Sequence, residues 1–178
     1  MKKALAFVIV FSIFAISIST AQSFGIKMGM TYDDLVSMGC KPTPEGHLNK
    51  YFITPPNPHA LFVSYAVDIS PIYGVDMIAA VSQDISTPSD GSELKGAFNV
   101  IKRQISKTYG KSLDYDFVRE GSSYKEESYW MSALYDNDRT LASYWDRDAG
   151  SNMPDDLDSI VLIAGAKYSL GSGLVGYL

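Results

Sequence analysis

The chain has 178 residues, of which 46% are hydrophobic and 20% are charged. This composition is that of an ordinary globular protein, and the length is sufficient for one domain with a core. The formal net charge of −5 argues against nucleic acid as a partner, because binding the phosphate backbone requires a basic surface.

The N-terminus has the pattern of a secretory signal peptide. Lys2 and Lys3 precede an apolar run over residues 4–18, and small residues at 19–21 form the cleavage site. A retained membrane anchor is disfavoured because a run of about 15 residues falls short of the roughly 20 that span a bilayer. We predict cleavage after Ala21, a periplasmic or secreted location, and no membrane span in the mature chain.

The mature chain, residues 22–178, is predicted to form a single globular α+β domain of 157 residues. Its net charge is −7, since the signal peptide carries two lysines and no acidic residue. This charge permits a basic protein as the partner, although an acidic soluble protein needs no partner to explain its charge.

In chain order, residues 24–30 alternate loosely and predict a first strand. Thr31 and Asp34 fit a helix capping box, and Gly39 ends the helix after about two turns. Cys40, the only cysteine, follows this helix, so no intramolecular disulfide can form. We interpret Cys40 as a small buried hydrophobe rather than a nucleophile, although His47 or His59 would be available as a base.

Residues 51–54 predict a short strand that the proline-rich segment 55–58 ends. The clearest strand covers residues 61–70, in which alternate apolar side chains share one face. These side chains are Leu61, Val63, Tyr65, Val67 and Ile69. Residues 75–85 predict an antiparallel partner for this strand.

The strongest pattern is that of an amphipathic helix between Asp90 and Gly110, with Asp90 or Ser92 as the N-terminal cap. Its apolar face is formed by Leu94, Ala97, Phe98, Ile101, Ile105 and Tyr109. The sequence thus predicts an α+β fold, an antiparallel sheet packed against one long amphipathic helix, with a short N-terminal helix added.

The remaining segments are predicted to be mostly strands. They are 113–119, 139–146, 159–167 and 174–178, whereas 126–138 is ambiguous between helix and strand. Gly171, Gly173 and Gly176 match a dinucleotide-binding fingerprint, but no helix can follow so near the C-terminus. We interpret this motif as a turn leading into the last strand.

The acidic loop over 146–158 is a candidate calcium site because hard cations prefer oxygen ligands. Its oxygen-bearing residues are Asp146, Asp148, Asn152, Asp155, Asp156 and Asp158. The two positions that define an EF-hand loop hold Ser151 and Leu157 instead of glycine and glutamate, which favours a solvated acidic loop.

Other chemistry is weakly represented. Two histidines and one cysteine are too few for a zinc site made by the protein alone. No nucleophile-elbow motif occurs, and carboxylate pairs such as Asp116 with Glu120 or Glu126 with Glu127 are ordinary in an acidic protein. We therefore predict no catalytic, cofactor-binding or metal-binding residue, and no cofactor.

Aromatic residues gather over residues 124–145. They are Tyr124, Tyr129, Trp130, Tyr135, Tyr144 and Trp145. Such side chains pack at the edge of a core or form an interface with a partner, and the sequence leaves both open.

The stretch from 24 to 40, FGIKMGMTYDDLVSMGC, resembles the opening of small exported α+β modules. Its residues Gly29, Met30, Thr31, Asp34, Leu35 and Gly39 match the pattern. The stretch is similar to the SmpA/OmlA type of outer-membrane-assembly lipoproteins, to β-lactamase-inhibitor-protein-like domains, and to uncharacterised proteobacterial exported proteins. The resemblance implies protein binding rather than catalysis.

We therefore predict an exported, non-catalytic protein-binding domain of the inhibitor, immunity or envelope-accessory type, whose oligomeric state is open. One alternative is a small-ligand or calcium-binding periplasmic module that uses the loop 146–158. Another is an enzyme whose site combines scattered carboxylates with His59.

Overall fold

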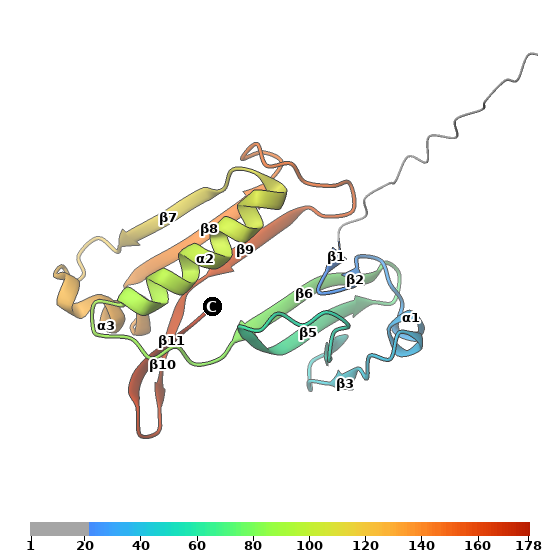
Figure 1. Ribbon diagram of the computed structural model, residues 1–178, viewed down its shortest axis with the longest axis horizontal. Helices are drawn as coiled ribbons and strands as arrows, with labels where there is room; N and C mark the ends of the chain where they lie inside the picture. The colour runs from blue at the N-terminus through green and yellow to red at the C-terminus, as the bar shows by residue number, and fades with distance from the viewer. Residues whose placement is uncertain (1–21) are drawn as a thin grey trace, which may run out of the picture.

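A computed structural model describes residues 22–178, and the predicted signal peptide lies outside the described residues. Two groups of strands lie side by side, one from each half of the chain (Figure 1). The N-terminal half begins with the short hairpin β1 and β2 and the helix α1, followed by an antiparallel sheet in the order β3-β4-β5-β6. The bounds are β1 Gln22–Ser23, β2 Ile26–Lys27, α1 Tyr32–Ser37, β3 Thr43–Pro44, β4 Lys50–Phe52, β5 Phe62–Ser70 and β6 Gly74–Ser82.

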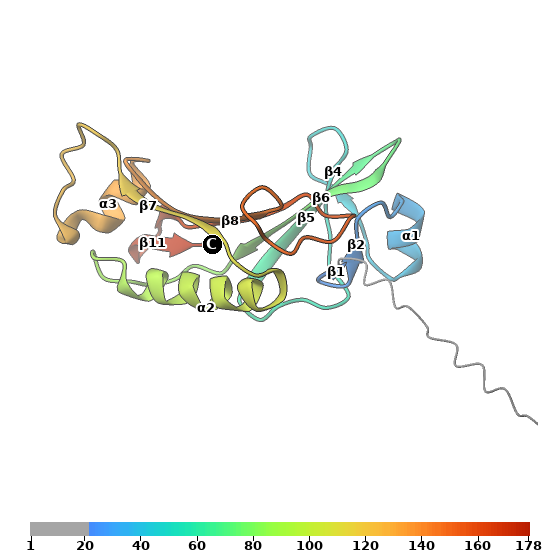
Figure 2. The same ribbon diagram turned by 90° about the horizontal axis from the view of Figure 1, so that it is seen from above.

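The C-terminal half begins with α2, which lies across a three-stranded antiparallel sheet in the order β7-β8-β9 (Figures 1 and 2). A 3₁₀ turn and α3 connect β7 to β8, and the hairpin β10-β11 ends the chain. The bounds are α2 Ser92–Tyr109, β7 Leu113–Val118, η1 Glu127–Tyr129, α3 Trp130–Tyr135, β8 Arg139–Asp146, β9 Ser159–Ile163, β10 Gly165–Ser169 and β11 Gly173–Tyr177.

The predicted fold class, one antiparallel sheet packed against one long helix, is wrong. The chain is mostly β, with about 21% helix, and its strands are divided among separate antiparallel sheets. The periodicity of each segment indicates its own secondary structure but not which strands pair, and strand pairing is what divides the chain. The helix α2 packs in the C-terminal half alone, while the N-terminal sheet has a different core.

Each half buries its own hydrophobic cluster. The N-terminal cluster contains Ile26, Leu35, Cys40, Ile53, Tyr65, Val67, Ile69 and Val75. The C-terminal cluster contains Leu94, Phe98, Ile101, Trp130, Met131, Leu134, Trp145, Leu162, Ala164 and Leu178.

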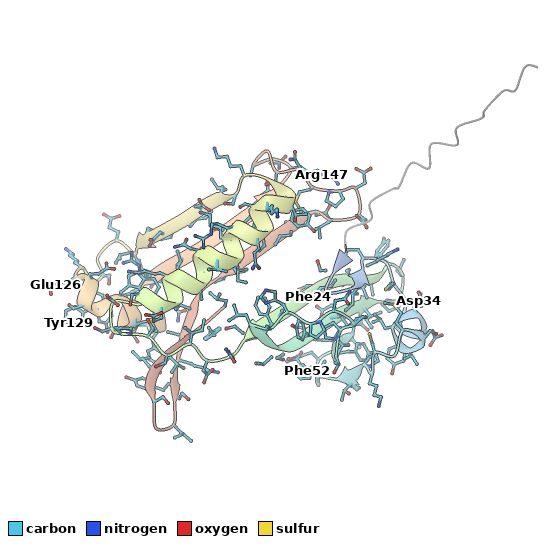
Figure 3. The ribbon with its side chains drawn as sticks, viewed as in Figure 1. Phe24, Asp34, Phe52, Glu126, Tyr129 and Arg147 are labelled. Atoms are coloured by element: carbon cyan, nitrogen blue, oxygen red, sulfur yellow. The ribbon has the colours of Figure 1, made fainter. Side chains whose placement is uncertain are left out.

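The two halves are joined where the end of β6 meets the end of the chain. The Ser82 N–H donates to the Leu178 carbonyl at 3.0 Å, and the Ile85 N–H donates to the Gly176 carbonyl at 2.8 Å. Phe62 packs against both clusters. The aromatic rings of Phe24 and Phe62 meet edge to face beside β5, and Figure 3 shows Phe24 at that position.

The capping box at α1 is confirmed. The Asp34 N–H donates to the Thr31 hydroxyl at 3.1 Å, and the Asp34 carboxylate accepts from the Thr31 N–H at 2.8 Å. The hydrogen bond from the Thr31 N–H, and to a lesser extent that with the Thr31 hydroxyl, lowers the pKa of Asp34. Because α1 has only six residues, this cap and the buried side chain of Leu35 are what hold it in place.

Two strand predictions are wrong in their bounds. The segment 24–30 contains a turn, since Phe24 and Gly25 have φ values of 58° and 86°. The segment 159–167 is two strands, because Ala164 separates β9, which pairs with β8, from β10, which pairs with β11. The ambiguous segment 126–138 contains η1 and α3.

The long helix and the clearest strand are confirmed, each with one local difference. Gly91 is the N-terminal cap residue of α2, and the Asp90 carboxylate accepts the Ser92 N–H at 3.0 Å. In β5, Val63 is exposed because the register shifts between Phe62 and Ser64, which is the signature of a β-bulge.

Candidate functional site

The C-terminal sheet has an inner face that α2 covers. Along β8, Leu141, Ser143 and Trp145 point to this side, as does Leu162 of β9. The Trp145 indole Nε1–H lies 3.2 Å from both the Ser106 hydroxyl and the Gly110 carbonyl at the end of α2. This face is therefore sealed by packing and by hydrogen bonds.

The outer face of the same sheet is also apolar. We define the outer β-face as the side chains on the side opposite α2. They are Leu113, Tyr115 and Phe117 of β7, Tyr144 of β8, and Val161 and Ile163 of β9. The strand register aligns Leu113, Tyr144 and Val161 in one row and Tyr115, Ala142 and Ile163 in the next. The rings of Tyr115 and Tyr144 meet edge to face at 5.5 Å, which gives the face an aromatic centre.

At the centre of the outer β-face Ala142 is almost fully buried, whereas most of the larger side chains around it are exposed. Figure 2 shows α2 below the sheet and no helix or strand above its centre. Leu113, Phe117 and Ile163 are 48%, 51% and 52% exposed, values far above those of core side chains. The β7–β8 part of the face forms an open, shallow groove of about 330 Å³, and Asp146 lies at one end of it. Contiguous apolar surface of this kind marks an interaction site in soluble proteins.

Two carboxylates line the other side of β7. Asp114 accepts from Lys102 Nζ at 2.6 Å and from the hydroxyls of Ser112 and Ser143 at 2.7 Å each. Partial burial acts to raise the pKa of Asp114, but these three hydrogen bonds together outweigh burial and hold the pKa below its usual value. Asp116 accepts from Arg139 at 2.8 Å.

The aromatic-rich region separates into core and surface residues. Trp130 is buried, and two cations lie over its ring, with Lys95 Nζ at 4.7 Å and Arg139 Cζ at 5.3 Å from the ring centroid. Tyr129 and Tyr135 are exposed, so the tryptophans belong to the core and these tyrosines to the surface. Figure 3 places Tyr129 at one end of the C-terminal sheet and Arg147 at the other.

The interpretation of Cys40 as a buried hydrophobe is confirmed. Its side chain packs in the N-terminal cluster, and burial raises the pKa of its thiol. Among the described residues, neither histidine makes a hydrogen bond with Cys40. His59 instead accepts the Leu61 N–H on Nδ1 at 3.2 Å, which ties it to the turn before β5.

The acidic loop does not bring its carboxylates together. The Asp146 carboxylate accepts the Ala149 N–H at 2.6 Å, and Arg147 pairs with Asp155 at 3.6 Å. Over residues 22–178, no group of three or more histidine, cysteine or acidic side chains is close enough to hold a metal ion.

Members of the predicted carboxylate pairs form ion pairs with basic side chains, and the glycine motif forms a turn. Asp116 pairs with Arg139, and Glu127 pairs with Lys95. The glycine motif forms the turn between β10 and β11, as predicted, with Gly171 and Gly173 at φ values of 82° and 75°. None of these residues faces the outer β-face.

The sequence contained a signal for the outer β-face that the prediction did not use. Leu113, Tyr115 and Phe117 alternate with polar residues, and Val161 and Ile163 flank Leu162 in a continuous apolar run. A strand that is apolar on both faces predicts burial on both sides. Only the structure shows that one of these two faces is exposed to solvent.

Comparison of the chain with protein-family models, with curated proteins and with solved structures gives no match. The resemblance of residues 24–40 to exported modules therefore stays a prediction. Across residues 22–178, no helix combines the length and the apolar character needed to cross a membrane.

Proposed function

We propose that this chain is an exported, non-catalytic protein that binds another protein through the outer β-face. The observation that carries the proposal is a contiguous aromatic and aliphatic surface on a sheet whose other side is already packed. Leaving such side chains in water opposes solubility, so their presence is best explained by a partner that covers them.

The composition of the outer β-face supports protein binding over small-ligand binding. Its groove is open and shallow, whereas small-molecule sites are concave and enclose most of the ligand. Tyr115, Phe117 and Tyr144 are residues of the type that contribute most to protein interfaces, since each combines a large contact area with few rotatable bonds. The signal-peptide pattern at residues 1–21 supports a partner in the periplasm or outside the cell.

A pull-down from periplasmic extract tests this proposal. A variant with Leu113→Thr, Phe117→Thr and Ile163→Thr removes apolar area from the outer β-face. Threonine also favours β-strands, so the strands should still form. We expect this variant to lose a partner that the unmodified protein captures saturably, at low and at high salt.

The control changes three apolar side chains elsewhere that are even more exposed than those of the outer β-face. The control substitutions are Leu48→Thr, Ile72→Thr and Leu170→Thr, at positions 91%, 81% and 104% exposed. We expect this variant to retain the partner. Equal loss by both variants, or no saturable capture by the unmodified protein, contradicts the proposal.

A further inference from the structure

We propose that the open edge of β7 binds an extended segment of the partner as an added strand, whose side chains alternate between apolar and basic. This inference rests on the proposed function and specifies the chemistry of the partner. It follows from three features of β7, namely its free edge, its apolar row and its acidic row.

The edge of β7 is available for strand addition. β7 is the outermost strand of its sheet and pairs only with β8 (Figure 1). Beyond that pairing, no backbone group of Leu113–Val118 makes a hydrogen bond within the described part of the chain. In an edge strand, alternate residues direct their N–H and C=O groups outward, and these groups can pair with an incoming strand.

The outer β-face continues to this edge. Leu113, Tyr115 and Phe117 are all exposed and lie on one side of β7. Directly opposite residues in an antiparallel pair have Cβ atoms about 5 Å apart. An added strand therefore places every second side chain beside this row, where an apolar side chain gains the most from burial.

The other side of β7 carries the acidic row, Asp114 and Asp116. Their side chains remain 50% and 52% exposed even though Lys102 of α2 pairs with Asp114 and Arg139 of β8 pairs with Asp116. Asp116 binds Arg139 through Oδ1, and its Oδ2 accepts no hydrogen bond from residues 22–178. Side chains of the added strand on this side lie next to carboxylates, so basic side chains are favoured.

The same row disfavours a second copy of this chain as the added strand. In an antiparallel β7–β7 pair with matching faces, Tyr115 opposite itself brings Asp114 opposite Asp116 of the other copy. Like charges directly opposite destabilise a strand pair. The acidic row therefore protects the edge from self-association and selects a basic partner strand.

The test uses the purified protein and a fluorescein-labelled peptide in which valine and lysine alternate over about nine residues, a length matched to one strand. We expect saturable binding by fluorescence anisotropy. Methylating the amide nitrogens along one edge of the peptide should weaken binding at least about tenfold, because several backbone hydrogen bonds to β7 are lost. Methylating the other edge should leave binding nearly unchanged, and hydrogen exchange should slow at alternate amides of β7.

Charge variants test the second half of the proposal. Asp114→Asn and Asp116→Asn should each weaken the valine–lysine peptide about two- to fivefold, the range of a cross-strand ion pair. Asp33→Asn, which changes an exposed acid on α1, is the control and should have no effect. A valine–glutamate peptide should bind more weakly than the valine–lysine peptide.

Three outcomes overturn the inference. They are equal binding of both methylated peptides, no preference for lysine over glutamate, and a concentration-dependent dimer that protects β7 without any peptide. The proposed function fails separately, in the pull-down, if the outer β-face variant keeps its partner. If the outer β-face variant loses the partner but the unmodified protein binds both methylated peptides equally, the partner binds to the face and not to the edge of β7.

Discussion

The two faces of the C-terminal sheet are both apolar, yet only one is covered. On the inner face, Trp145 and Leu162 are packed under α2 and are almost fully buried. On the outer face, their sequence neighbours Tyr144, Val161 and Ile163 contact water. The buried inner-face side chains stabilise the fold, whereas the exposed outer-face side chains contribute little to it. An apolar side chain that folding does not bury therefore points to a use outside the fold.

The largest expected effect contrasts adjacent residues on the two faces. Trp145→Ala should lower the free energy of unfolding by about 3–5 kcal/mol, because it opens a cavity under α2 and removes two hydrogen bonds. Tyr144→Ala, one residue away on the outer face, should cost about 1 kcal/mol, the worth of its edge-to-face contact with Tyr115. Urea denaturation measures both, and similar losses would show that the outer face also belongs to the core.

The second effect concerns how closely β11 approaches the helix that covers the inner face. A Cβ atom at Gly176 would lie 2.4 Å from a terminal methyl carbon of Leu94, so Gly176→Ala should destabilise the protein by about 1–3 kcal/mol. Combining it with Leu94→Ala should cost less than the sum of the single changes.

The control for Gly176 is Gly96, an exposed helical glycine where an added Cβ would meet no atom within 4 Å apart from its chain neighbours and the backbone of its own helix. Gly96→Ala should stabilise α2 by about 0.5–1 kcal/mol in the same denaturation measurement. A stabilising Gly176→Ala substitution would mean that α2 and β11 do not pack closely.

The third effect is a pH dependence at Asp114, which lies on the α2 side of β7. The pKa of Asp114 is lower in the folded than in the unfolded chain, so its stabilising contribution is complete above about pH 4. That contribution is lost as the pH falls through the folded pKa. The stability difference between the unmodified protein and Asp114→Asn should therefore shrink as the pH falls below about 4.

Unfolding curves at several pH values check this prediction, with Glu120→Gln as the control for removal of an exposed charge. A pH-independent difference would show that the Lys102 and serine hydrogen bonds do not favour the ionised carboxylate.

The smallest effect is expected on the outer face itself. Val161→Thr combined with Ile163→Thr should change the free energy of unfolding by less than about 1 kcal/mol, since threonine keeps the strand preference and both sites are exposed. Leu162→Thr, between them on the inner face, should cost several times more because it places a hydroxyl in the core. Equal costs at all three positions would remove the distinction between the faces.

The sequence by itself determined the local elements of this protein. The Thr31–Asp34 capping box, the strand over 61–70 and the long amphipathic helix were all predictable, because caps, period-two alternation and helical periodicity are properties of neighbouring residues. The burial of Cys40 followed from its place after a capped helix, and the structure bears it out.

Only the tertiary structure decided how these elements are grouped. Pairing β8 with both β7 and β9, and not with the N-terminal strands, creates separate sheets where one was predicted. This pairing depends on contacts between residues far apart in the sequence. The same pairing leaves one apolar face uncovered. Leu113, Phe117 and Ile163 have the composition of core residues, and their exposure is settled by where α2 packs, which no local pattern records.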